Sequence, residues 1–74
     1  MNDDINIELL KRIMKYHGWT NQKLADAMGI ARDTLQRRFR DRDISLKEVK
    51  QMMRLIPLTY EEVGVIFFNK KSDE

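Results

Sequence analysis

Apolar residues recur at intervals of three and four in the first part of the chain, between residues 6 and 17. An α-helix brings side chains at this spacing onto one face. Asn6 is a suitable N-cap, because its side chain can accept a backbone N–H. The pattern predicts a helix from here to His17, stopped by Gly18 and preceded by a loose polar lead over Met1–Ile5. The expected inward residues are Ile7, Leu10, Ile13 and Met14, flanked by the partly buried Leu9 and Tyr16.

Two shorter amphipathic segments follow, separated by Gly29. Thr20 is a candidate N-cap for the first, and Trp19 and Leu24 have the spacing of a hydrophobic staple. Glycine best adopts the left-handed conformation that ends a helix, so Gly29 predicts a break. The inward residues are Leu24, Ala25 and Met28 in the first segment, and Leu35 and Phe39 in the second, over about residues 31–40. The opposite face of the second segment is polar: Arg32, Asp33, Gln36, Arg37 and Arg40.

Two capping boxes predict two further helices. Ser45 with Glu48, and Thr59 with Glu62, are spaced so that each side chain can satisfy the other residue's backbone N–H. The first of these helices must end before Pro57, because proline disfavours helical geometry in the preceding residue. A short fifth helix then starts after Thr59. The expected buried stripe of the fourth helix is Leu46, Val49, Met52, Met53 and Ile56.

Length and composition limit the fold further. Seventy-four residues suffice for one domain, residues 1–74, with an ordered core over about 6–68 and a polar tail at 69–74. Three glycines and one proline leave little room for loops, which favours an all-α fold. The chain has no cysteine for a disulfide or a thiolate zinc site, and no apolar run near the roughly 20 residues that span a bilayer. We expect a soluble cytoplasmic protein without metal or membrane contact.

Positive charge is concentrated in one part of the chain. The net charge is only +2, which by itself does not imply nucleic acid, but five of the seven arginines fall between residues 32 and 42. A charged run is often no more than a solvated helix face. Arginine rather than lysine favours recognition here, because the guanidinium group can grip guanine or phosphate through two parallel hydrogen bonds.

The stretch from Thr20 to Arg40 resembles the helix-turn-helix of the XRE family, the lambda-type phage repressors and Cro proteins. The resemblance implies a five-helix, lambda-repressor-like DNA-binding domain whose central helix-turn-helix places its second helix in the major groove. The ending LTYEEVGVIFF is similar to that of a small phage-encoded subgroup from Gram-positive hosts, so that the resemblance covers about residues 7–68. The features that match in the central motif are Thr20, Leu24-Ala25, Met28-Gly29-Ile30 and Thr34-Leu35.

Two positions depart from the family pattern. Relatives often have glycine at the place of Asp41, where the chain leaves the second helix in a left-handed conformation, so Asp41 is expected to adopt it. Many relatives carry glutamine at the place of Asn21, where it touches a phosphate and braces the second helix. Asn21 is one methylene shorter, which puts its bracing role in doubt.

DNA recognition combines phosphate contacts, which position the protein, with base contacts, which specify the sequence. By donor chemistry Arg32 or Arg37 suits guanine and Gln36 suits adenine, while Asp33 suits cytosine or braces an arginine. The expected base-reading residues are Ala31, Arg32, Asp33, Thr34, Gln36 and Arg37. The expected phosphate contacts are Thr20, Asn21, Gln22, Arg38, Arg40 and Arg42.

The sequence contains no arrangement of residues typical of an active site. The single histidine, His17, stands without a cysteine or clustered carboxylates, and Ser45 serves as a cap. The carboxylate pairs Asp3-Asp4 and Glu61-Glu62 fall in the polar lead and in the first turn of a helix, where acids favour the helix dipole. We expect neither an enzyme nor a cofactor or small-molecule ligand.

The run Val65, Ile66, Phe67 and Phe68 holds more apolar surface than one helical face can bury. Either Ile66 or Phe67 closes the monomer core and the rest is partly exposed, or the surplus forms a self-complementary dimer patch.

The leading interpretation is a transcriptional regulator, a repressor of phage or mobile-element type associated with the host nucleoid. It would bind a palindromic operator in double-stranded DNA as a homodimer, at least on DNA. The alternative is a protein-interaction adaptor or antirepressor-type module that uses the Val65–Phe68 patch. RNA binding is less favoured, because the outward face of the second segment carries no aromatic side chain for stacking.

Overall fold

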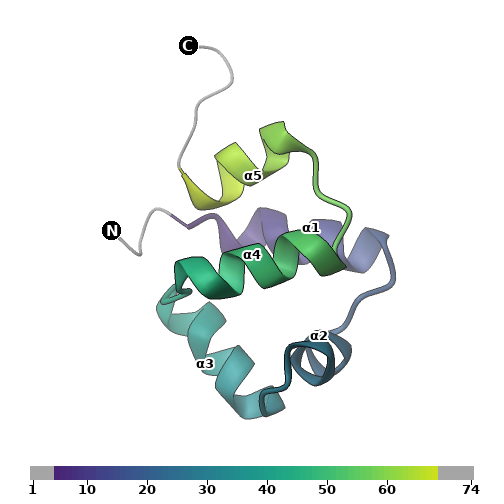
Figure 1. The fold of residues 1–74 in the computed structure, drawn as a ribbon, viewed down its shortest axis with the longest axis vertical. Helices are drawn as coiled ribbons and strands as arrows, with labels where there is room; N and C mark the ends of the chain where they lie inside the picture. The colour runs from purple at the N-terminus through teal and green to yellow at the C-terminus, as the bar shows by residue number, and fades with distance from the viewer. Residues whose placement is uncertain (1–4, 69–74) are drawn as a thin grey trace.

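The computed structural model describes residues 5–68, which form five helices and no strand (Figure 1). Residues 1–4 of the expected polar lead, and the polar tail at 69–74, lie outside the described residues. The predicted all-α fold with five helices is confirmed. The helices are α1 (Ile7–Tyr16), α2 (Asn21–Met28), α3 (Arg32–Asp41), α4 (Leu46–Leu55) and α5 (Tyr60–Phe67).

Side-chain caps start four of these helices at the predicted positions. The Asn6 side-chain oxygen accepts the Leu9 N–H at 3.1 Å, and the Thr20 hydroxyl accepts the Lys23 N–H at 3.1 Å. Each cap satisfies a backbone donor that the first turn leaves without an intrahelical partner. Both predicted capping boxes are complete, Ser45 with Glu48 on α4 and Thr59 with Glu62 on α5.

Two helices end in left-handed residues. Gly29 follows α2 with φ +75°, as predicted, and the next N–H donates back to the Ala25 carbonyl at 3.0 Å. The prediction for the end of α3 is wrong by one residue. Asp41 is the last residue of α3, and Arg42 takes the left-handed conformation with φ +54°. The helix continues through Asp41 because the 6→1 hydrogen bond that closes it joins the Asp43 N–H to the Arg38 carbonyl at 3.0 Å.

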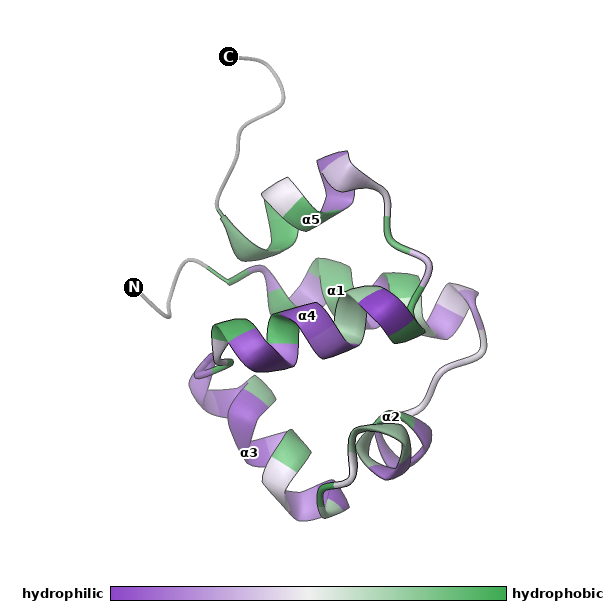
Figure 2. Cartoon of the chain, viewed as in Figure 1, coloured by the Kyte–Doolittle hydropathy of each residue, from purple (hydrophilic) through white to green (hydrophobic). Residues whose placement is uncertain are grey.

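The core is one cluster to which every helix contributes. α2 contacts both α3 and α4, and α5 contacts α1. Figure 2 shows α3 as mostly hydrophilic and α5 as mostly hydrophobic. The buried residues are Ile5, Ile7, Leu10, Ile13, Met14, Leu24, Ala25, Met28, Leu35, Phe39, Ile44, Val49, Met52, Ile56, Val63, Ile66 and Phe67.

Four burial predictions are wrong. Leu46 and Met53 are 61% and 38% exposed, because these residues, seven apart, share a face of α4 that lies beside the stripe of Val49, Met52 and Ile56. Tyr16 is 84% exposed; it is the last residue of α1, and the buried stripe of that helix ends at Met14. Ile5, expected in a loose lead, is buried in the core. Isoleucine is apolar, so removing its side chain from water stabilises the fold.

Candidate nucleic-acid interface

The turn between α2 and α3 depends on a backbone conformation and on a close helix contact. Leu24 and Ala25 of α2 are fully buried, and α2 is in contact with α3. A Cβ atom added at Gly29 would meet nothing within 4 Å, so space does not require the glycine. Its φ of +75° does, because an L side chain is strained there.

The inner side of α3 anchors it to the body of the domain. Leu35 is fully buried and Phe39 is 2% exposed. The Lys11 ammonium of α1 lies 5.7 Å from the centre of the Phe39 ring, close enough for a cation–π contact. These contacts hold one side of α3, so its opposite side is presented to solvent on a fixed frame.

The outer side of α3 carries the residues predicted to read bases. Arg32, Asp33 and Arg37 are exposed, as is Ala31 at the N-cap. Neither Arg32 nor Arg37 forms an ion pair or hydrogen bond with a side chain of residues 5–68. The remaining two predicted base readers, Thr34 and Gln36, are half-buried.

The start of α3 differs from the starts of the other helices. Its N-cap, Ala31, has no side chain that can accept a hydrogen bond, so the first N–H groups of α3 lack a side-chain acceptor. Asp33 lies in this first turn, where its negative charge is favourable with the helix dipole. Asp33 makes no ion pair within the described part of the chain, so bracing of an arginine by Asp33 does not occur in this structure.

The end of α3 carries three arginines that were predicted to contact phosphate, and the structure separates them. Arg40 is exposed, and its Nε donates to the neighbouring Asp41 carboxylate at 3.2 Å. Both side chains of that pair lie in solvent, where such a contact stabilises little. Arg38 is half-buried, and its guanidinium forms an ion pair with Glu48. The other Glu48 oxygen accepts the Ser45 N–H at 3.0 Å, so Glu48 joins α3 to the cap of α4.

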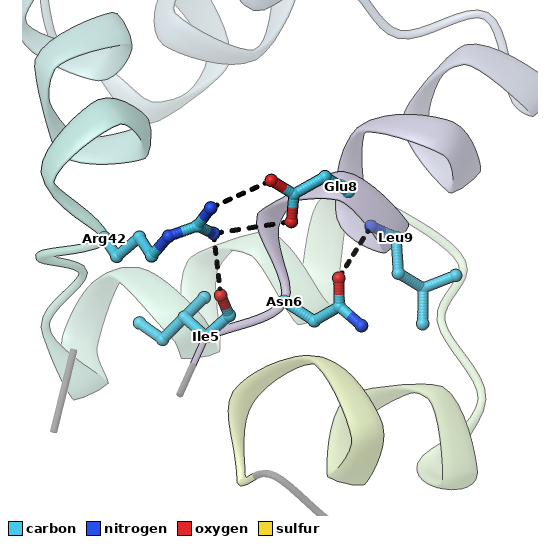
Figure 3. Close-up of polar contacts among 5 residues, drawn as sticks. All are labelled: Ile5, Asn6, Glu8, Leu9 and Arg42. Carbon is cyan, nitrogen blue, oxygen red and sulfur yellow. Dashed lines mark hydrogen bonds and ion pairs between the residues drawn. The ribbon is translucent and has the colours of Figure 1, made fainter. Parts of the chain in front are cut away.

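The third arginine, Arg42, reaches across the domain to the start of α1 (Figure 3). Its Nη2 donates to Glu8 Oε2 at 2.8 Å, and its Nη1 donates to the Ile5 carbonyl at 3.0 Å and to Glu8 Oε1 at 3.5 Å. The hydrogen bond from Arg42 holds the pKa of Glu8 below its ordinary value of 4.5, with a smaller contribution from Lys11. Arg38 and Arg42 therefore already have carboxylate partners within the domain, which the sequence did not indicate.

The start of α2 holds the remaining predicted phosphate contacts. Thr20 is the N-cap, and Asn21 follows as the half-buried first residue of α2. The Gln22 amide donates to the Asp26 carboxylate at 2.9 Å. The Lys23 ammonium lies 4.9 Å from the centre of the Trp19 ring. The Thr20 hydroxyl accepts one N–H of this first turn, that of Lys23, and the N-terminus of a helix in general favours an anion.

Comparison with protein families bears on this arrangement. A family model described as helix-turn-helix, HTH_3, matches residues 5–63, most of the chain. The chain belongs to the helix-turn-helix family. This confirms the resemblance to the XRE-type motif, and it indicates a DNA-binding regulator. Comparison with curated proteins and with solved structures finds no match.

Residues 5–68 hold neither a candidate membrane span nor a cluster of metal-ligating side chains. No helix there is both long and apolar enough to cross a bilayer. No three histidine, cysteine, aspartate or glutamate side chains in the same residues are grouped as metal ligands would be.

A basic face on α4 was missed by sequence reasoning. Lys47, Lys50 and Arg54 are exposed, and they line an open hollow of about 500 Å³ together with Leu46 and Gln51. None of these three cations forms an ion pair with a described residue. Their spacing of three and four was the signal available in the sequence, because it places them on one helical face.

The end of α5 shows which of the apolar residues from Val65 to Phe68 belong to the monomer core. Ile66 is fully buried and Phe67 is 9% exposed, so both close the core of the monomer. Phe68 is 63% exposed, and Val65 is half-buried. The prediction of a four-residue dimer patch is therefore wrong for Ile66 and Phe67, because these side chains already fill the space between α5 and the other helices.

Proposed function

We propose that this helix-turn-helix protein is a sequence-specific transcriptional regulator that inserts α3 into the major groove of double-stranded DNA. The observation that carries the proposal is the outer face of α3. There Arg32 and Arg37 extend from a helix whose inner side is fixed by Leu35 and Phe39, and neither arginine has an intramolecular ion-pair partner among the described residues. Exposed guanidinium groups on a rigid helix suit the edges of guanine.

The base-reading role is assigned to six residues at the start and middle of α3. Arg32 and Arg37 donate to guanine O6 and N7, and Gln36 pairs with adenine. Asp33 is the selective residue. Its carboxylate accepts a hydrogen bond from cytosine N4, and in most other registers its negative charge repels the DNA. Ala31 and Thr34 are assigned to apolar contact with a thymine methyl.

The phosphate-contacting role is assigned to the start of α2 and to Arg40. Thr20, Asn21 and Gln22 lie at the N-terminus of α2, where a phosphate oxygen is favoured by the helix dipole. Among the described residues Arg40 pairs only with its exposed neighbour Asp41, which it can exchange for a phosphate. Arg38 and Arg42 would have to leave Glu48 and Glu8, so they contribute less to this role.

Dimeric binding follows from the size of the interface. One module of this kind buries roughly 600–1,000 Å² of protein surface, which limits its affinity, and two copies on half-sites about 34 Å apart overcome that limit. We propose a homodimer on a palindromic operator, with Phe68 and Val65 as the apolar residues still available to its interface. A repressor of phage or mobile-element type, working in the nucleoid of a bacterial cytoplasm, fits this description. The adaptor alternative loses most of its contact surface, since Ile66 and Phe67 are buried.

Selection of bound sites from a random pool of duplexes tests this proposal. The expected outcome is a palindrome whose half-sites are centred about one helical turn apart, bound with an affinity that falls steeply as salt is raised. Retention of all duplexes alike, or of none, would contradict sequence-specific regulation. A shuffled duplex of the same composition, measured at the same two salt concentrations, is the control.

A further inference from the structure

We propose that Arg42 is a positioning residue of the DNA interface: it clasps the end of α3 to the Ile5–Glu8 segment and so sets the direction in which α3 meets DNA. The name Arg42 clasp is used here for the contacts of Arg42 with Ile5 and Glu8. This inference rests on the proposed function, and it assigns to Arg42 a role other than direct phosphate binding.

The Arg42 clasp joins parts of the chain that are far apart in sequence. The guanidinium uses both terminal nitrogens, one on Glu8 Oε2 at 2.8 Å and the other on the Ile5 carbonyl at 3.0 Å and Glu8 Oε1 at 3.5 Å. Figure 3 shows the fork lying between the end of α3 and the first turn of α1. The clasped segment is itself held, because the Ile5 side chain is buried and the Asn6 N–H donates to the Ile66 carbonyl at 2.8 Å. The end of α3 is thereby linked through α1 to α5.

The backbone conformation of Arg42 also indicates that its side-chain contacts matter. Its φ of +54° is the only positive value at a non-glycine residue of the described chain. An L side chain is disfavoured in that region, so the position would suit glycine better if the backbone alone mattered. The hydrogen bonds of the side chain offset this strain, so the left-handed turn is stabilised by the Arg42 clasp.

A second ion pair acts on the same half of α3. Arg38 contacts Glu48, whose other oxygen accepts the Ser45 N–H at the cap of α4. The end of α3 is thus tied to α1 on one side and to α4 on the other, while Arg32 and Arg37 extend outward from the rest of α3. A small rotation at the tied end moves both arginines relative to the bases, and base contacts tolerate little displacement.

Glu8→Gln separates the two possible roles of Arg42. If Arg42 were a phosphate contact held back by Glu8, the variant would release it and tighten binding to every duplex. If the Arg42 clasp positions α3, the variant weakens binding to the selected duplex relative to a single-mismatch duplex. The ratio of the two affinities should fall about two- to fivefold, the range that an exposed ion pair transmits. Glu61→Gln is the matched control, because it removes the same charge from an exposed position on α5.

Arg42→Gly provides the second variant, since it removes the fork while relieving the backbone strain and so keeps the protein folded. We expect it to lower the same affinity ratio and to leave the slope of log affinity against log salt unchanged. Loss of a phosphate contact would instead reduce that slope by about one. Amide hydrogen exchange supplies a readout independent of DNA: exchange in the last turn of α3 should be faster in both variants than in Glu61→Gln.

The outcomes distinguish the two proposals. If the unaltered protein binds no duplex selectively, the proposed function fails. If it binds selectively and Glu8→Gln matches Glu61→Gln in affinity ratio and in exchange, the positioning role of Arg42 fails. Binding of every duplex more tightly by Glu8→Gln than by Glu61→Gln, or a reduced salt slope in Arg42→Gly, also overturns it in favour of a phosphate contact.

Discussion

Replacing Gly29 with alanine isolates the contribution of a single backbone conformation to the helix-turn-helix. A Cβ atom at this position meets nothing within 4 Å, so the substitution introduces no steric clash with the rest of the protein. What remains is the strain of an L residue at φ +75°, about 1–2 kcal/mol. For a domain of this size each kcal/mol corresponds to roughly 4–8 °C in Tm, so we expect Gly29→Ala to lower Tm by about 4–16 °C.

Gly18 offers a matched control for this substitution. It has φ +81°, and a Cβ atom added there also meets nothing within 4 Å. Gly18→Ala should therefore lose a similar amount of stability, measured by thermal unfolding under the same conditions. Gly29 lies between α2 and α3, whereas Gly18 lies between α1 and α2. Only Gly29→Ala should weaken binding to the selected duplex at a temperature where both variants are fully folded.

Three results would refute this reasoning. A Gly29→Ala protein as stable as the unaltered one would mean that the turn does not need a left-handed residue. A loss far above the estimate would mean that the added methyl group meets an obstacle, contrary to the open space at Gly29. Equal weakening of DNA binding by Gly18→Ala would mean that binding follows overall stability, and that the geometry between α2 and α3 has no separate effect.

The other predictions concern the arginines, the acid response and the end of α5. Arg37→Ala should cost about 1–3 kcal/mol on the matched duplex and blur preference at one base pair, whereas Arg40→Ala should weaken all duplexes alike and reduce the salt slope by about one. Binding isotherms on matched and mismatched duplexes decide this, and equal losses everywhere for both would reverse the assignment. Because Arg42 lowers the pKa of Glu8, the stabilisation from this pair is complete above pH 4.5 and is lost as pH falls through the lowered pKa. Glu8→Gln should remove that part of the acid sensitivity in urea unfolding at decreasing pH; an unchanged pH profile would contradict it. Phe68→Ser should leave Tm nearly unchanged but lower the dimer fraction on DNA, measured by sedimentation, and a large fall in Tm would place this side chain in the core instead.

Local sequence determined the elements of this protein. The caps at Asn6, Thr20, Ser45 and Thr59 appear where their spacing predicts them, and Gly29 ends α2 in the expected conformation. Each of these features depends on residues within one helical turn of one another, so nearby side chains contain the necessary information. The outward exposure of Arg32 and Arg37 was predictable for the same reason, because helical periodicity alone separates them from Leu35 and Phe39.

Tertiary structure decided which polar and apolar side chains find partners. From the sequence, Arg38, Arg40 and Arg42 were all predicted to contact phosphate. In the structure Arg42 pairs with Glu8, which lies 34 residues away, and Arg38 pairs with Glu48. Ile66 and Phe67 likewise had two possible destinations, and the packing of α5 placed both in the core. Periodicity describes directions around one helix axis, whereas the partner of a charge or the width of a buried stripe depends on how the helices are arranged. That arrangement leaves three arginines on the outer side of α3 and directs two into the domain.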